Sequence, residues 1–183
     1  MQIAEQKLKS NIAEYILYMY QIEDVIRAYQ MDLDMIMENY VSPQLPDSSF
    51  SGQYRKWYSA LIMQMKSQGL EKSGHVTEIK EVMIELTYLH NTMLNLTDND
   101  KYKNIYQAAS KYLDEFKGKS DLKDRNHVEI AFNALYMKLL LKLQKKEISP
   151  ESEEAFDSMR IMLAFLSRAY VRMKEGDLDF LNN

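Results

Sequence analysis

Apolar and aromatic residues near the start of the chain recur alternately three and four positions apart. They are Ile12, Tyr15, Met19, Ile22, Ile26, Tyr29, Leu33, Ile36 and Tyr40. This alternation keeps one apolar seam on a single face of a long helix, where a partner helix can pack against it. The spacing therefore predicts that residues 3–40 form a long, largely buried N-terminal helix, with room for a bend near Met31.

Further segments carry apolar stripes at helical spacing, and Gly and Pro are scarce, with 5 and 3 residues in the whole chain. A β-rich fold would need many more turn residues, so this scarcity favours few, long helices. We predict one all-α domain, residues 1–183, built as an antiparallel bundle of five to six helices around the N-terminal helix. Near its end, Phe180 and Leu181 are expected to dock back onto the bundle.

Local signals mark where these helices begin and end. Gly69 suits the end of the second helix, and the third is expected to begin at Ser73 or Gly74. Thr97 and Asp98 offer oxygens that can cap the fourth helix.

Two capping signals come later in the chain. Asn126 and Glu129 have the spacing of a capping box, which predicts the start of the fifth helix. Ser149 and Pro150 fit an N-cap followed by proline at the first helical position, which predicts the start of the sixth.

Composition narrows the classes of function. The chain has no cysteine, so disulfides, thiolate metal sites and cysteine nucleophiles are excluded. The net charge of −4 gives no general attraction to nucleic acid or to anionic lipid. We find no signal-peptide core and no apolar run long enough to span a bilayer, and so expect a cytoplasmic protein without nucleic-acid or membrane partners.

Motifs for metal or phosphate chemistry are weak. None of His75, His90 and His127 follows a glutamate by three residues, as a di-iron helical bundle requires, and no phosphate-binding glycine motif occurs. We therefore expect no cofactor, metal site or catalytic residue. Acidic residues at helical spacing leave a magnesium-dependent all-α phosphohydrolase as a minor alternative, although helical geometry places them on the solvent face. These acidic residues are Glu78, Glu81, Glu85, Glu154 and Asp157.

A polar group flanks the apolar seam of the first helix. Glu23 and Arg27 are four residues apart in the order that favours an ion pair, and Tyr20 precedes Glu23 by about one turn. If these side chains are buried, they fix the register of the helix or form the polar floor of a pocket. His90 lies on the apolar stripe of the third helix and is either a hydrogen-bonded core residue or a further member of that pocket.

The first thirty residues resemble an uncharacterised family of Bacteroidetes proteins, domain-of-unknown-function family 4924. The residues that carry the likeness are Lys7, Asn11, Ile12, Ala13, Glu14, Tyr15, Met19, Gln21, Ile22, Glu23, Asp24, Ile26 and Arg27. The resemblance implies a bacterial, all-helical, single-domain protein without an assigned activity. It supplies no catalytic residue.

Two hypotheses from different classes follow. The long seam and the 13 methionines offer more apolar surface than a small bundle needs, which favours a non-enzymatic interaction or scaffold protein acting as a homodimer or with another protein. The alternative is a small-molecule-binding protein or enzyme with a polar pocket near Tyr20, Glu23 and Arg27.

Overall fold

The computed structural model describes residues 2–177 and residue 179, so Phe180 and Leu181 lie outside the described residues. The described part of the chain is helical and has no strand, which confirms the all-α class. Its α-helices are α1 (Gln2–Ser10), α2 (Ile12–Ala28), α3 (Leu33–Ile36), α4 (Ser51–Ser67), α5 (Thr77–Asn95), α6 (Asp100–Gly118), α7 (His127–Leu143) and α8 (Pro150–Lys174). A π-helical turn at Met37–Val41 and short 3₁₀ turns at Ser42–Gln44 and Ser48–Phe50 join α3 to α4.

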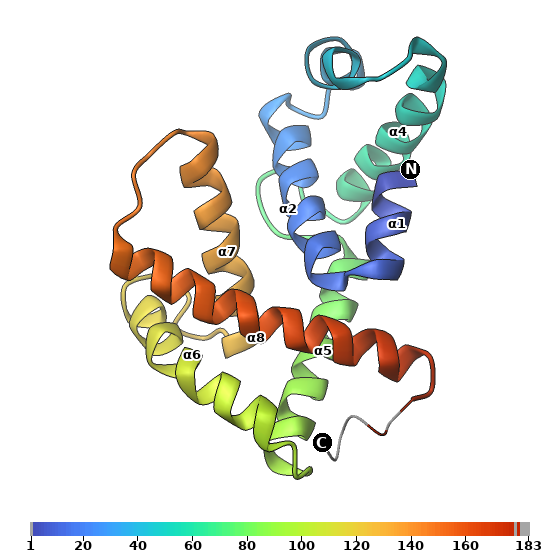
Figure 1. The fold of residues 1–183 in the computed structure, drawn as a ribbon. Coiled ribbons are helices and arrows are strands. Elements are labelled where there is room, and N and C mark those ends of the chain that lie inside the picture. The colour runs from blue at the N-terminus through green and yellow to red at the C-terminus, as the bar shows by residue number, and fades with distance from the viewer. Residues whose placement is uncertain (1, 178, 180–183) are drawn as a thin grey trace.

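The longest helix, α8, organises the arrangement of the others (Figure 1). It packs against α6 and α7, which also contact each other, and against α2 and α5. The helices α1, α2 and α4 lie beside one another and line a shared hollow. None of the helices in the described chain combines the length and the apolar character that crossing a bilayer requires.

The expected single helix over residues 3–40 is wrong, and the described chain has eight α-helices rather than five or six. The first interruption is at Asn11, whose extended backbone ends α1 and whose side-chain oxygen accepts a hydrogen bond from the N–H of Glu14 at 3.2 Å. The same oxygen accepts the hydroxyl hydrogen of buried Ser167, on α8, at 2.8 Å. Because α8 supplies this partner, the cap of α2 is held in place and α1 packs back against α2.

The second interruption follows α2. Gln30 and Met31 adopt left-handed backbone conformations, with φ of 53° and 63°, which side chains other than glycine rarely adopt. The N–H of Met31 donates to the carbonyl of Ile26 at 2.9 Å and closes the turn. Ile26 and Ile36, on either side of it, are both fully buried. The apolar seam is therefore real, but its residues reach the core through two helices rather than one.

Capping explains which helix boundaries were predicted correctly. Gly69 follows the cap of α4 with φ of +66°, and the predicted caps at Asn126 and Ser149 are present, with Glu129 completing the capping box. The predicted cap at Thr97 and Asp98 is wrong, because Asn99 takes that role by accepting the N–H of Tyr102 at 2.9 Å.

The predicted start of α5 at Ser73 or Gly74 is also wrong. The helix begins at Thr77, and its cap residue Val76 makes no capping bond with its own side chain. The reason is tertiary, since side chains of α2 hold residues 70–76 out of the helix.

Replacing Asn11 tests the first interruption. We expect Asn11→Ala to lower the free energy of unfolding by about 2–3 kcal/mol, because α2 loses its cap and the buried Ser167 hydroxyl loses its acceptor. Urea denaturation measures the change. The control Asn104→Ala, at an exposed position inside α6, should change stability by less than about 0.5 kcal/mol. If the two substitutions change stability equally, Asn11 neither caps α2 nor binds Ser167 as described.

Candidate functional site

Glu23, on α2, is a fully buried carboxylate with two partners. Its Oε1 accepts the backbone N–H of Val76 at 2.8 Å, and its Oε2 lies 2.5 Å from Nδ1 of His75. Val76 is the residue from which α5 starts, so the negative charge lies at the positive end of that helix. Glu23 thereby supplies the cap that α5 lacks locally and orients the ring of His75.

Tyr20 lies about one turn before Glu23 and packs directly on this histidine. The rings of Tyr20 and His75 are stacked, with centroids 3.8 Å apart and planes 10° from parallel. The ring of Tyr136, on α7, lies edge-on to the ring of Tyr20, with the two centroids 5.6 Å apart. Burial raises the pKa of the Tyr20 phenol, and the charges of Glu23 and Glu129 raise it further. Tyr20 is therefore a neutral, fixed platform under His75.

Arg27 binds the loop of residues 70–76 at points that precede His75. Its Nε donates to the carbonyl of Leu70 at 3.0 Å, and its Nη2 donates to the carbonyl of Gly74. Its Nη1 pairs with Asp24 at 2.8 Å, and Asp24 in turn accepts the hydroxyl hydrogen of Tyr136 at 2.6 Å. Glu23 and Arg27 therefore do not form the expected ion pair. Each of them binds the 70–76 loop separately, Arg27 through backbone carbonyls and Glu23 through His75 and the N–H of Val76.

His90 belongs to a different cluster. It is buried on α5, its Nδ1 lies 2.5 Å from the hydroxyl of Tyr102, and the ring of Tyr106 meets it edge-on at 4.9 Å. The Tyr106 hydroxyl is 2.8 Å from Nδ1 of His127, whose Nε2 is 3.1 Å from Asp114. Burial, with the nearby His127, lowers the pKa of His90 to about 4, so this ring is neutral at physiological pH.

The structure thus brings together Tyr20, Glu23 and Arg27, around the 70–76 loop, and leaves His90 outside their contacts. Sequence reasoning missed His75, which completes the group. The one available signal was indirect: a buried glutamate needs hydrogen-bond donors, and a histidine in a nearby loop can supply one. Nothing in the local sequence shows that His75 lies opposite Glu23.

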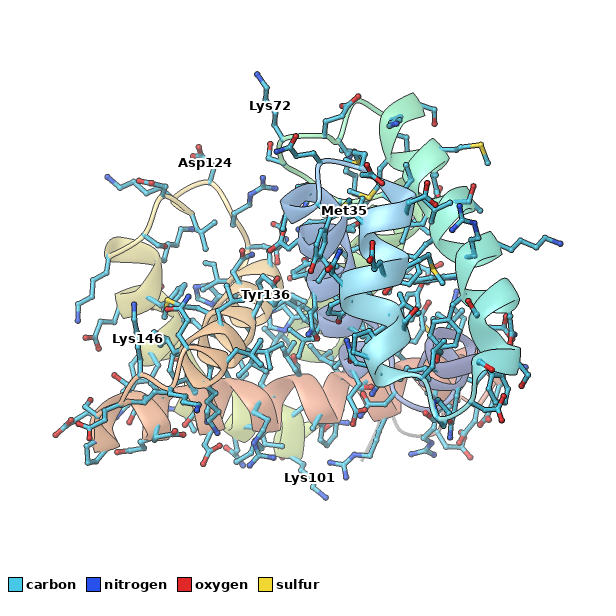
Figure 2. All side chains as sticks on the ribbon, turned by 90° about the horizontal axis from the view of Figure 1, so that it is seen from above. Met35, Lys72, Lys101, Asp124, Tyr136 and Lys146 are labelled. Carbon is cyan, nitrogen blue, oxygen red and sulfur yellow. The ribbon has the colours of Figure 1, made fainter. Side chains whose placement is uncertain are left out.

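His75 also lines an open groove of about 590 Å³ between α5 and the start of α7. We call this hollow the α5–α7 groove. Figure 2 shows the loops that carry Lys72 and Asp124 rising on the same side of the molecule. The wall formed by α5 consists of Ile79, Lys80, Met83, Ile84, Thr87, Tyr88 and Asn91. The remaining lining residues are Tyr20, Gly74, His75, Arg125, Asn126 and Glu129.

A second hollow, of about 490 Å³, lies between α6, α7 and α8. Apolar side chains of these helices line it, among them Phe116, Met137, Phe156 and Met159. Its polar lining residues include the exposed side chains of Glu115, Lys119 and Glu151. None of the described residues that line this hollow is a histidine bound to a buried carboxylate, as His75 is bound to Glu23. The α5–α7 groove is therefore the stronger candidate site.

The acidic residues considered for magnesium binding are engaged elsewhere or exposed. Glu85 accepts the hydroxyl hydrogen of Tyr170 at 2.6 Å and pairs with Lys174 at 2.8 Å. These two bonds hold the pKa of Glu85 below its usual value. Asp157 pairs with Arg160 at 3.1 Å. Among the described residues, no group of three or more His, Cys, Asp or Glu side chains is placed to hold a metal ion.

Gly74 offers a direct test of the loop geometry. Its φ is +90°, and a Cβ added there would lie 3.1 Å from Cδ2 of Leu70. We expect Gly74→Ala to lower the free energy of unfolding by about 1–2 kcal/mol, because an L side chain is strained in this conformation. Chemical denaturation measures it.

Gly52 provides the matched control, because a Cβ there would meet no atom within 4 Å and its backbone is helical. Gly52→Ala should leave stability unchanged or raise it by up to about 1 kcal/mol. If both substitutions have the same effect, the 70–76 loop does not adopt the conformation described.

Comparison with known proteins places the chain in a family. No curated protein and no solved structure gives a match. The model of one family matches residues 1–177, well beyond the N-terminal segment that carries the resemblance. Because that match covers almost the whole sequence, the chain belongs to the family described as domain of unknown function DUF4924.

Proposed function

We propose that the chain is a small-molecule-binding protein and that the α5–α7 groove is its binding site. The observation that carries this proposal is the pair of Glu23 and His75. The fully buried carboxylate of Glu23 is hydrogen-bonded to His75, whose side chain is 33% exposed and lines the groove. Burying a charge is costly, and here the buried charge fixes a polar side chain at an open cavity.

The size and character of the groove support the proposal. Its volume of about 590 Å³ falls within the usual range for small-molecule sites of ~300–1,000 Å³. Apolar and aromatic side chains line it together with several polar and charged ones, and small-molecule sites combine apolar walls with polar groups that fix the orientation of the ligand. The floor is rigid, since His75 is stacked on Tyr20 and hydrogen-bonded to Glu23.

We propose binding rather than catalysis. The hydroxyl of Thr87, which lines the groove, donates to the carbonyl of Met83 at 2.8 Å instead of to His75. The described residues therefore do not pair this hydroxyl with a base, as nucleophilic catalysis would require.

The chain has no cysteine and a net charge of −4, which supports a cytoplasmic protein that does not bind nucleic acid.

A fragment screen tests the proposed binding site. In NMR spectra of the isotope-labelled full chain, we expect bound fragments to shift the amides of His75, Lys80 and Thr87. Thr87→Trp, which places an indole in the groove, should abolish these shifts. The control Gln107→Trp, at an exposed position on α6, should preserve them. Fragments that bind only elsewhere, or that bind the Thr87→Trp variant equally well, would refute this site.

Self-association is a second candidate, favoured by a separate observation. The most exposed large apolar side chains of the described chain are on α5 or at its C-cap: Leu96 at 77%, Tyr88 at 69% and Ile84 at 68%. Exposed apolar surface of this kind supports docking to a second copy.

Light scattering during gel filtration tests self-association. We expect about twice the monomer mass, reverting to the monomer mass in the double variant I84K/Y88K, because charge at these positions opposes docking. As a control, Met63→Lys changes an exposed methionine on α4 and should leave the mass unchanged. A monomer at high protein concentration would contradict this candidate.

A further inference from the structure

We infer that the ligand of the α5–α7 groove is a small amphiphilic carboxylate, with an apolar body on α5 and its acid group at Lys80 and Arg125. This inference rests on the proposed binding function and specifies the ligand class. Three features of the groove carry it: an apolar strip, a set of available donors, and an acidic residue that is already occupied.

The apolar strip runs along α5. Ile84 and Tyr88 are one turn apart on the same face of the helix, and both expose more than two thirds of their side chains. Met83 contributes to the same wall from a buried position. A flexible methionine beside two exposed apolar side chains suits an aliphatic or aromatic body of variable shape.

The available donors lie at the end of the groove where α5 begins. Lys80 is one turn before Ile84 and lines the groove, and no ion pair of Lys80 is found among the described residues. His75 is not one of these donors, because its Nδ1 hydrogen-bonds to Glu23 and Nε2 of a ring that carries its proton on Nδ1 can only accept a hydrogen bond. The ammonium of Lys80 donates charge-assisted hydrogen bonds, so it suits an acidic head group.

Arg125 brings a further positive charge from the segment before α7. It lines the groove together with Tyr20 and His75. Its Nη1 pairs with Glu129 at 2.9 Å, while its side chain stays 59% exposed. The rest of the guanidinium is therefore accessible to a second carboxylate.

The acidic residue of the groove argues against a cationic ligand. Glu129 accepts hydrogen bonds from Arg125, from the backbone N–H of Asn126 at 3.2 Å and from its side-chain amide at 2.8 Å. Its carboxylate is thus used in the capping box of α7. Because Arg125 pairs with Glu129, Lys80 is the charged lining residue that has no ion pair among the described residues. An unpaired cation favours an anionic ligand over a cationic one.

Three probes that differ only in their head group test the inference: octanoate, octanol and octylamine. They are titrated at neutral pH into the isotope-labelled full chain, and NMR follows the amides of His75, Lys80 and Thr87. We expect octanoate to bind at least about tenfold more tightly than either other probe, because only its head group forms charge-assisted bonds with the groove donors.

Lys80→Gln removes one positive charge and should weaken octanoate binding by about three- to tenfold, with little effect on octanol. Lys101→Gln serves as the control, because Lys101 is exposed at the start of α6 and does not line the groove (Figure 2). If the probes bind in the groove with equal affinity, the carboxylate preference is refuted while the binding site stands. If no probe reaches the groove, the inference is overturned, and the fragment screen decides separately on the proposed function.

Discussion

The buried carboxylate of Glu23 joins three parts of the molecule at once. It lies on α2, accepts the backbone N–H at which α5 starts, and binds the ring of His75. Losing either partner would leave one oxygen of a fully buried carboxylate without a hydrogen bond, which costs at least about 1–3 kcal/mol. For this reason the path of the 70–76 loop, the first turn of α5 and the orientation of His75 depend on one another. The floor of the α5–α7 groove is therefore set by the same interaction that joins α2 to α5.

Local signals in the sequence were sufficient for the helical class and for several helix boundaries. Gly69, Asn126 and Ser149 mark boundaries through conformations and hydrogen bonds that involve only their neighbours in sequence, and the structure places them as predicted. The apolar seam also identified core residues correctly, since Ile12, Ile22 and Ile26 are almost completely inaccessible to solvent. Such features are readable because the interactions that cause them are short in range.

Features that depend on distant partners could not be read in this way. The helix break at Asn11 depends on Ser167, which is 156 residues away, and the delayed start of α5 depends on Glu23. The predicted pairing of Glu23 with Arg27 was wrong. Helical spacing shows which side chains on one helix can meet, but it does not show that groups of a distant loop will bind them instead. His75 was missed for the same reason. Polar groups in a core are matched by tertiary geometry, and a single sequence does not contain that geometry in local form.

Glu23 fixes the ring of His75 by accepting a hydrogen bond from Nδ1, because a carboxylate can only accept hydrogen bonds. Long-range proton–nitrogen NMR correlation of the histidine rings at neutral pH tests this most directly. We expect a protonated Nδ1 on His75 in the native protein, and loss of that preference in Glu23→Gln, whose side-chain amide can donate to the ring. A native His75 that carries its proton on Nε2 alone, or a ring state unchanged by Glu23→Gln, would contradict it.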